Sequence, residues 1–428
     1  MRVLQVNKFL YPAGGTETVM FQTADLLRGH GHEVSFFGMQ DDRNVADVAG
    51  EYLVSNVDYS GSTAAHGAAR FKRWLSAGRI LHSQEAARKL EALITETRPD
   101  VAHLHNIYHQ LSPSILGVLR RHSIPTLLTL HDYKLICPNY MLHTHDAVCE
   151  RCKGHRYYQA VLQGCVKGSR LNGVICATEA YSNGLTQVYE KSIDTFIAPS
   201  RFMQRKMAEF GAGAGRIAYV PNFIDVAAFE PRYEAQPYFV FAGRLERVKG
   251  VSTLLRAVAA SQLASRFELR IAGDGAVRQE LERQAAADGR SNVRFLGRFS
   301  RDALRDLLQN AMFVVVPSEW YENAPMSVLE AYAYGKPVIG ARIGGIPELI
   351  EHGETGLLFE PGNAQALQQA IDDLLTHPGL AQQMGRNARR LVEDAYGPQL
   401  HYERLMALYS RPRQVDEAGR LLHERTRV

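Results

Sequence analysis

Two glutamates, Glu322 and Glu330, stand eight positions apart in the stretch YENAPMSVLEAYAYGKPV, with Pro325 between them. On one continuous helix, eight steps of about 100° would leave the two side chains roughly 80° apart, so they would not share a face. Proline suits the first turn of a helix and holds the preceding residue, Ala324, in an extended conformation. The sequence therefore predicts a helix that begins near Pro325 or Met326, with Glu322 before it and Glu330 inside it.

This predicted helix start suits a ligand that carries both phosphate groups and sugar rings. A helix N-terminus presents unpaired N–H groups and a partial positive charge, which favour an anion. The carboxylates of Glu322 and Glu330 would repel phosphate but accept hydrogen bonds from hydroxyl groups. A nucleotide sugar has hydroxylated rings on both sides of its phosphates, and we predict that it is bound here by Asn323, Ala324, Pro325, Met326 and Glu330. The simpler interpretation is a pair of solvated carboxylates near a helix end.

Further candidate residues follow short apolar runs elsewhere in the chain. Arg244 and Lys249 come after YFVFAG, and a planar guanidinium with a nearby ammonium suits two phosphates. His131 follows TLLTL, and Gly15 lies in YPAGGTE, where glycine lets backbone N–H groups approach a ligand. Comparable positions are held by His103, His105, Gly273, Gly275 and Gly344. Each type also has a structural interpretation: surface charge for the cations, a core or capping role for the histidines, and turn formation for the glycines.

The apolar runs themselves predict the architecture. In the first half they are VLQVN, EVSFFGM, VAHLHN, TLLTLHD and TFIAPS; in the second they are YFVFAGR, ELRIAGDG, VRFLG, MFVVVPS, PVIGARIGG and GLLFEPG. Such runs alternating with helical patterns are typical of parallel sheets with crossover helices. In open parallel sheets, ligands bind beyond the carboxyl ends of the strands. The candidate residues after both sets of runs therefore predict a cleft between two domains.

We predict an α/β protein with two doubly wound, Rossmann-like domains. The first is expected over residues 1–222 and the second over 223–395, joined by VPNFIDVAAFEPRYEAQPY, which is rich in proline and turn residues and has no periodicity. A C-terminal helix within residues 396–428 is expected to cross back to the first domain.

Composition sets the broad class of protein. A chain of 428 residues is too long for one typical core, and 46% hydrophobic with 22% charged residues is usual for a soluble globular protein. The formal net charge of +4 gives no argument for nucleic-acid binding, and we predict none. No run of eighteen apolar residues and no apolar leader is found, so we expect a cytoplasmic location.

A family resemblance rests on several of these motifs together. FAGRLERVKG, AGDG, FLGR, YENAPMSVLEAYAYGKPVIGARIGGIPELI and HGETGLLF resemble, in order and spacing, the donor-binding half of a family 4 glycosyltransferase with the GT-B fold. GGTE and TLHD extend the resemblance to the N-terminal half. It implies retaining transfer of a sugar from a UDP- or GDP-linked donor to a glycan or lipid-linked acceptor in polysaccharide biosynthesis, with no cofactor required for the chemistry. Gly15 would direct its N–H toward phosphate or acceptor.

The resemblance also implies roles for single residues. Glu330 would hold the ribose hydroxyls, and Glu322 the hydroxyls of the transferred sugar. His131 matches the position beside the donor sugar at the reaction centre. Arg244 and Lys249 would stabilise the departing diphosphate, because preorganised cations act strongly on developing charge. We therefore predict His131, Glu322, Arg244 and Lys249 as catalytic residues, and Gly15 and Gly273 as further donor contacts.

An irregular segment of about residues 137–176 departs from the family pattern. It contains Cys137, Cys149, Cys152 and Cys165. A Cys-x-x-Cys pair flanked by single cysteines resembles a four-thiolate zinc clip, which would hold together a segment with little apolar content. We therefore predict a possible structural zinc site. Free thiols are the alternative, and disulfides do not suit the cytoplasm.

A basic segment, ARFKRWLSAGRILHSQEAARKL at residues 69–90, mixes cations with Phe71, Trp74 and Leu75. Such a segment could rest on an anionic membrane surface, which predicts a possible peripheral membrane contact. The other interpretation is a solvated helix over the N-terminal core.

Two other functions compete with a transferase. A nucleotide-sugar epimerase can share the fold and the donor, and a non-catalytic nucleotide-sugar-binding protein would need only the pocket. The two cations Arg244 and Lys249, together with Glu322 and Glu330, match transferases better than epimerases. A binding protein has no need of a clamp for a leaving diphosphate.

Overall fold

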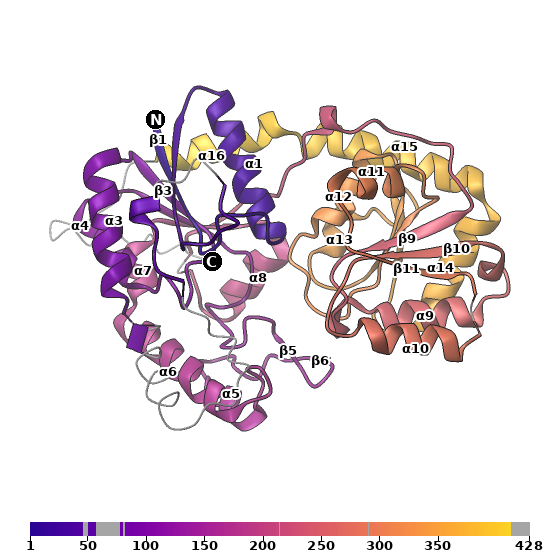
Figure 1. Ribbon diagram of the computed structural model, residues 1–428, viewed down its shortest axis with the longest axis horizontal. Coiled ribbons are helices and arrows are strands. Elements are labelled where there is room, and N and C mark those ends of the chain that lie inside the picture. Colours follow the sequence, from indigo (N-terminus) through magenta and orange to yellow (C-terminus); the bar gives the residue numbers. More distant parts are fainter. Residues whose placement is uncertain (46–49, 57–77, 80–81, 214, 290, 412–428) are drawn as a thin grey trace.

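The computed structural model describes residues 1–45, 50–56, 78–79, 82–213, 215–289 and 291–411, and it has two lobes (Figure 1). Each lobe is built on a six-stranded, fully parallel sheet. This arrangement confirms the predicted α/β class with two Rossmann-like units. Residues 69–77, 80 and 81, half of the segment 69–90 and including Phe71, Trp74 and Leu75, lie outside the described residues.

The first sheet has the strand order β2-β1-β3-β4-β7-β8. Its strands are β1 (Arg2–Val6), β2 (Glu33–Phe37), β3 (Val101–Leu104), β4 (Thr126–Thr129), β7 (Thr195–Ala198) and β8 (Ile217–Tyr219). The sequence predicted each of these except β8. That strand has only three residues, all of them partly exposed, and so it gives no apolar run.

Helices cover both faces of this sheet. They are α1 (Gly15–Gly29), α3 (Gln84–Thr97), α4 (Ser114–Arg121), α7 (Val188–Ser192) and α8 (Arg201–Glu209), with a 3₁₀ turn, η1 (Gly50–Tyr52). Apolar side chains of α3 and α4, including Leu90 and Leu116, are buried against strand residues such as Leu104. The hydrophobic stripe of each helix is therefore what fixes it to the sheet.

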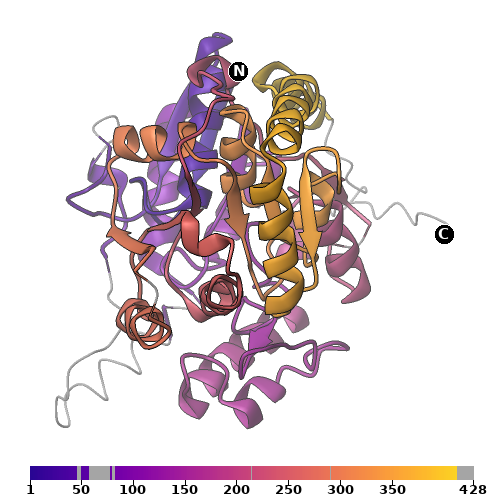
Figure 2. The ribbon, with the colours of Figure 1, turned by 90° about the vertical axis from the view of Figure 1, so that its right-hand side faces the viewer.

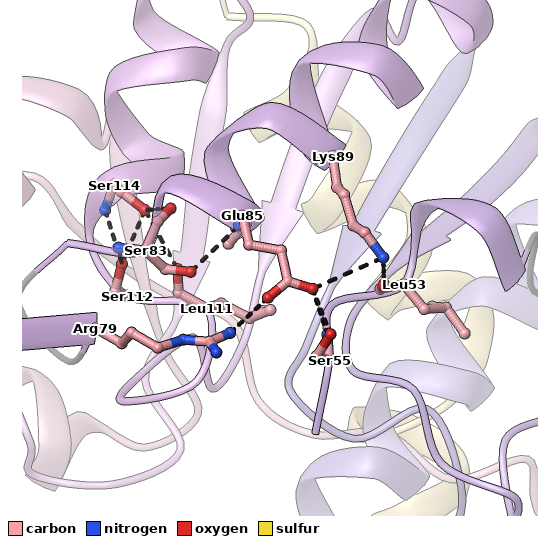
Figure 3. Close-up of polar contacts among 10 residues, drawn as sticks. Leu53, Ser55, Arg79, Ser83, Glu85, Lys89, Leu111, Ser112 and Ser114 are labelled. Atoms are coloured by element: carbon pink, nitrogen blue, oxygen red, sulfur yellow. Dashed lines mark hydrogen bonds and ion pairs between the residues drawn. The ribbon is translucent and has the colours of Figure 1, made fainter. Parts of the chain in front are cut away.

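The start of α3 is held by a polar network (Figure 3). Ser83 caps the helix, since its Oγ accepts from the N–H of Ala86 at 3.2 Å. Glu85 accepts from Ser55 Oγ at 2.6 Å and from Arg79 at 2.5 Å. Lys89, one turn further on, donates to the carbonyl of Leu53. These bonds tie the helix to the segment that follows η1.

The segment between β4 and β7 forms a small subdomain below the first sheet, seen at the bottom of Figures 1 and 2. It contains a short antiparallel hairpin, β5 (His143–Thr144) with β6 (Ala147–Val148), and two helices, α5 (Gln159–Gln163) and α6 (Arg170–Thr186). Gly173 of α6 packs directly on α5, because a Cβ there would lie 2.6 Å from the carbonyl oxygen of Ala160. Neither element of the hairpin was predicted, since two-residue strands leave no sequence pattern.

The second sheet has the order β11-β10-β9-β12-β13-β14. Its strands are β9 (Tyr238–Ala242), β10 (Glu268–Ala272), β11 (Val293–Gly297), β12 (Val314–Val316), β13 (Val338–Ala341) and β14 (Gly356–Phe359), all predicted from the sequence. Its helices are α9 (Val251–Ala260), α10 (Arg278–Ala287), α11 (Arg301–Gln309), α12 (Met326–Ala333), α13 (Ile346–Leu349), α14 (Ala364–Thr376) and α15 (Pro378–Ala395), with 3₁₀ turns η2 (Val226–Ala228), η3 (Arg247–Lys249) and η4 (Ala264–Arg266). The strand order reverses between β9 and β12, where loops diverge and ligands bind in open sheets.

The last described helix, α16 (Pro398–Tyr409), follows α15 and packs on the first domain (Figure 1). Its Tyr402 OH lies 2.9 Å from Nε2 of His32, and its Tyr409 OH lies 2.7 Å from Nδ1 of His103. Leu405 is buried beside residues of β1 and β3. The chain thus crosses between the lobes twice. Within the described ranges, no helix has the length and apolar character needed to cross a bilayer.

Candidate active site

Lys249 and Glu322, two of the predicted catalytic residues, form an ion pair with 2.6 Å between Nζ and Oε1. Lys249 lies in η3 after β9, and Glu322 lies in the loop after β12, so the pair spans the point where the strand order reverses. Ser318 Oγ also donates to the same oxygen at 2.7 Å. Burial by itself would raise the pKa of Glu322, but the charge of Lys249 and these hydrogen bonds lower it overall. The carboxylate is therefore held ionised.

Arg244 follows β9 and its side chain is 71% exposed, with Glu246 Oε1 3.1 Å from its Nη1. The loop that carries it is fixed from behind by glycines. Gly273 has φ 138°, and a Cβ there would lie 1.8 Å from the carbonyl oxygen of Gly243. A Cβ at Gly275 would lie 2.3 Å from the carbonyl oxygen of Leu245. Gly273, predicted as a donor contact, thus lets the loop after β10 approach the backbone around Arg244.

A second glycine pair supports the loop of Glu322. Gly344 has φ 62°, and a Cβ there would lie 2.3 Å from the carbonyl oxygen of Glu322. The N–H of Gly345 donates to that oxygen at 2.7 Å, and a Cβ at Gly345 would lie 1.8 Å from the carbonyl oxygen of Asn323. Only residues without side chains leave room for this approach. The loop after β13 therefore fixes the position of the backbone at Glu322.

The predicted helix starts at Met326, with Pro325 in the extended conformation before it. Glu330 lies one turn inside α12 and is partly exposed. The backbone before the helix is already engaged, since the carbonyl of Ala324 accepts from Asn222 Nδ2 at 3.0 Å. The structure thus separates Glu322 and Glu330 as the sequence suggested, one before the helix and one within it.

Loops of the two domains meet beside Glu322. The side chain of Asn323 donates to the carbonyl of Leu130 at 2.7 Å and accepts from Ser200 Oγ at 2.8 Å. Tyr133 OH donates to the carbonyl of Tyr321 at 3.1 Å. Leu130 and Tyr133 flank His131 in the sequence, and Tyr321 and Asn323 flank Glu322. The loop of His131 is therefore docked on the loop of Glu322, and the side chain of Asn323 serves this contact.

His131 is partly exposed and lies at the end of a row of buried polar groups on the first sheet. Its Nε2 lies 2.8 Å from Nδ1 of His105, whose Nε2 lies 2.9 Å from Oε1 of Gln5. His103 is stacked on His105 with ring centroids 4.6 Å apart, and its Nε2 lies 2.7 Å from Oγ1 of Thr129. Burial lowers the pKa of His131 to about 3, so this imidazole is neutral near pH 7. The sequence is compatible with a structural or a functional role for His105, and the structure places this residue directly behind His131.

Gly15 is the first residue of α1 and is exposed, and a Cβ there would have no atom within 4 Å. Beside this loop lies Lys8, partly buried and 5.1 Å from the ring centroid of Phe9. Burial lowers the pKa of Lys8, although the charges of Asp132 and Glu17 act in the opposite direction. Lys8 was not predicted as a site residue, although its position directly after the first apolar run could have indicated it as a candidate.

Two further residues that the sequence did not single out are Glu150 and Tyr321. Tyr321 OH donates to Glu150 Oε1 at 2.9 Å, and Lys206 Nζ donates to the same oxygen at 2.8 Å. Glu150 lies between Cys149 and Cys152. The cysteine-containing segment is therefore attached to the loop that carries Glu322.

The cysteines themselves are free thiols. Cys137 and Cys152 are hydrogen-bonded to each other, and Cys137 Sγ also lies 2.9 Å from Oδ1 of Asn139. The hydrogen bond with Cys137 and burial raise the pKa of the Cys152 thiol, and the charges of Cys165 and Cys149 act in the same direction. Even so, no set of three or more Cys, His, Asp or Glu side chains among the described residues is arranged to hold a metal ion. The zinc site remains a prediction.

Comparison with known proteins decides the family. Residues 13–228, half of the chain, match the family model for Glycosyltransferase Family 4. The chain belongs to glycosyltransferase family 4. Residues 225–391 of this family 4 protein match a second model, for Glycosyl transferases group 1, which covers the domain of Arg244, Lys249 and Glu322.

Curated relatives share part of the chain. The D-rhamnosyltransferase WbpZ of Pseudomonas aeruginosa is 40% identical over 153 residues, which are 35% of this chain and 39% of WbpZ. The alpha-D-kanosaminyltransferase of Streptomyces kanamyceticus is 29% identical over 219 residues, which are 48% of this chain and 56% of that enzyme. This chain thus spans about half the length of the curated relatives that it matches.

Solved structures match nearly the whole family 4 chain. Sucrose-phosphate synthase from Thermosynechococcus elongatus has a TM-score of 0.71 at 20% identity, covering 95% of this chain and 98% of that one. Anabaena HepE, solved in complex with UDP and glucose, has a TM-score of 0.66 at 18% identity, covering 96% and 99%. These likenesses confirm the predicted GT-B fold.

Proposed function

We propose that this protein is a retaining glycosyltransferase that moves a sugar from a UDP- or GDP-linked donor to a glycan or lipid-linked acceptor. The observation that carries the proposal is the docking of the loop of His131 on the loop of Glu322, with the Lys249–Glu322 pair beside it. In this proposal the cations Arg244 and Lys249, the carboxylate of Glu322 and the neutral imidazole of His131 act together at one interdomain site.

Each group has a chemical task in such a transfer. Departure of a nucleoside diphosphate develops negative charge, which Arg244 and Lys249 can stabilise from fixed positions. Arg244 is exposed, and among the described residues its one ion pair is with Glu246, so its planar guanidinium is available to two phosphate oxygens. Glu322, kept ionised, can accept hydrogen bonds from sugar hydroxyls. Glu330, inside α12, is suited to the ribose hydroxyls.

His131 is proposed to contact the donor sugar from the first domain. A neutral imidazole can donate one hydrogen bond and accept another, and which nitrogen does so depends on the partner of the other nitrogen. In this chain that partner is His105, so the row from Gln5 through His105 orients His131. The UDP and UDP-glucose complexes of Anabaena HepE support uridine as the nucleoside of the donor.

The experiment that tests the proposal is a donor panel. The protein would be incubated with UDP- and GDP-linked hexoses, with and without lipid-linked and free glycan acceptors. Acceptor-dependent release of nucleoside diphosphate supports the transferase. An isomerised donor would instead indicate an epimerase, and donor binding without turnover a non-catalytic binding protein. Retention is read from the anomeric configuration of the product.

A further inference from the structure

A cavity lies at the opposite end of the second sheet from the proposed donor site. Its volume is about 290 Å³, close to the lower limit for small-molecule sites. Pro237 and Pro337, which line it, directly precede β9 and β13. It is therefore at the amino ends of strands whose carboxyl ends carry Arg244 and lead to Gly344.

One lysine that lines the cavity has no counter-ion among the residues that the structure describes. Lys336 lines it and is only 2% exposed. The backbone N–H of Lys336 donates to the carbonyl of Ala331 at 2.9 Å, but its side chain makes no hydrogen bond or ion pair with any residue in the described part of the chain. None of the described lining residues is acidic. The charge of Arg232 acts on Lys336 and is repulsive.

A buried ammonium without a partner is unfavourable, and native proteins rarely keep one without a use. Burial, and after it the charge of Arg232, lowers the pKa of Lys336 to about 8, so at neutral pH most molecules still carry the charge. The long apolar stem of a lysine can pack in a core, but then its ammonium normally reaches bulk water. Lys336 instead lines a cavity with a volume that could admit a small anion.

The residues that line the cavity indicate which chemical class of anion would fit. Phe267, Met312 and Leu375 supply apolar surface, and Tyr233 supplies an aromatic ring. A single ammonium balances a single negative charge, whereas a phosphate monoester would bring about −1.5 to −2 charges into apolar surroundings. The amide side chain of Gln382 lies at the exposed rim.

We propose that this cavity is a binding site for a small organic carboxylate, with the carboxylate paired to Lys336 and an aromatic or branched apolar body against Phe267, Met312 and Leu375. The site is separate from the glycosyl-transfer machinery, so it does not depend on the proposed function. Its ligand contacts the turn after α12, the helix whose other end carries the predicted donor contacts.

Benzoate is the probe, with benzyl alcohol as its uncharged counterpart. Binding to the full-length protein is measured by calorimetry or ligand-observed NMR. Benzoate should bind roughly 10-fold or more tightly than benzyl alcohol at neutral pH, since an added charge-assisted hydrogen bond is worth at least this factor. Because the pKa of Lys336 is lowered to about 8, the preference should decrease as the pH rises through that value and be largely lost by about pH 10.

Variants locate the site. Lys336→Met keeps the length of the side chain and removes the charge, so it should reduce benzoate affinity to that of benzyl alcohol. Lys191→Met, at an exposed lysine of α7, is the matched control and should leave benzoate affinity unchanged. In the unmodified protein, benzoate should also slow acetylation of Lys336 by acetic anhydride, read by mass spectrometry, without slowing that of Lys191. Equal affinity for benzoate and benzyl alcohol, no binding of benzoate, or no protection of Lys336 would each overturn the proposal.

Discussion

Nζ of Lys249 lies 2.6 Å from Oε1 of Glu322, so the residue predicted to bind phosphate and the residue predicted to bind the sugar form one ion pair. The side chains are 20% and 8% exposed, and the pair is therefore largely removed from water. Breaking one side of such a pair leaves a buried charge without compensation. This relationship gives Lys249 a structural task besides the proposed catalytic one, and the two can be measured separately.

We expect Lys249→Met to lower turnover by roughly 10²-fold, because a fixed cation near the leaving diphosphate is lost. The same variant should lower the free energy of unfolding by roughly 2 to 4 kcal/mol, because Glu322 is left unpaired. Adding Glu322→Gln should restore most of the stability but none of the turnover. Turnover that recovers together with stability in the double variant would show that Lys249 acts only through the fold.

Arg244→Ala should also lower turnover by roughly 10²-fold. Unlike Lys249, Arg244 is 71% exposed, so its removal should leave the unfolding midpoint unchanged. Arg247→Ala is the matched control, because Arg247 lies in the same region, is 59% exposed and pairs with Glu280. Steady-state kinetics on both variants test this prediction. Equal losses of turnover would mean that any positive charge near the loop promotes the reaction and that Arg244 has no specific role.

Glu330→Ala should raise KM for the nucleotide sugar several-fold and leave kcat nearly unchanged. Contacts to the ribose are made equally in the ground state and the transition state, so their loss weakens binding alone. Glu322→Gln should do the reverse, because contacts to the moving sugar can strengthen during reaction. Initial rates over a range of donor concentrations measure both constants. If Glu322→Gln changes only KM, the two ends of the donor have been exchanged in our assignment.

As the pH falls, the first domain should begin to lose stability at a higher pH than the titration of ordinary carboxylates would cause. Burial lowers the pKa of His103 and His131 to about 3 and that of His401 to about 4, and it lowers the pKa of His105 well below its usual value. Unfolded imidazoles titrate near 6.5, so below that pH the unfolded chain binds protons that the native chain does not. Stability is therefore complete above about pH 6.5 and falls as the pH decreases toward 4, by roughly 1.4 kcal/mol per pH unit for each imidazole.

Urea unfolding midpoints between neutral pH and about pH 5 measure this loss. His401→Gln removes one imidazole that titrates in the unfolded chain, so stability should depend on pH less steeply, by about one proton. Glutamine can still donate to the carbonyl of Pro221 that His401 contacts, so the native contact is kept. A midpoint that stays constant over this range would contradict the assignment of neutral buried imidazoles.

If zinc binds Cys137, Cys149, Cys152 and Cys165, protein purified without chelator should carry about one equivalent, with Zn–S distances of roughly 2.3 Å by X-ray absorption. Because the described residues hold no set of three or more ligands arranged for a metal, zinc binding would require Cys149 and Cys165 to join the Cys137–Cys152 pair. Removing the metal should raise KM for the donor, because Glu150 between two of the cysteines is bonded to Tyr321. Metal-free, active protein with four titratable thiols would leave the zinc prediction without support.

The sequence predicted the elements and the order of the fold well. Runs such as YFVFAGR and MFVVVPS became buried parallel strands, because strands covered on both faces need continuous apolar residues. Pro325 set the start of α12 for a local steric reason. Strand β8 escaped detection, since its partly exposed residues carry no such pattern.

Pairings between distant residues were decided only in three dimensions. Lys249 and Glu322 are 73 positions apart, and Asn323 and Leu130 are 193 apart. Gly273 is required because a Cβ there would lie 1.8 Å from the carbonyl oxygen of Gly243, an approach that no neighbouring residue indicates. Local sequence determines which conformations each short stretch can adopt, because steric clashes and apolar periodicity act between near neighbours. Which side chains then meet depends on how the two sheets and their loops pack, because each such contact joins stretches that come together only when the whole chain has folded.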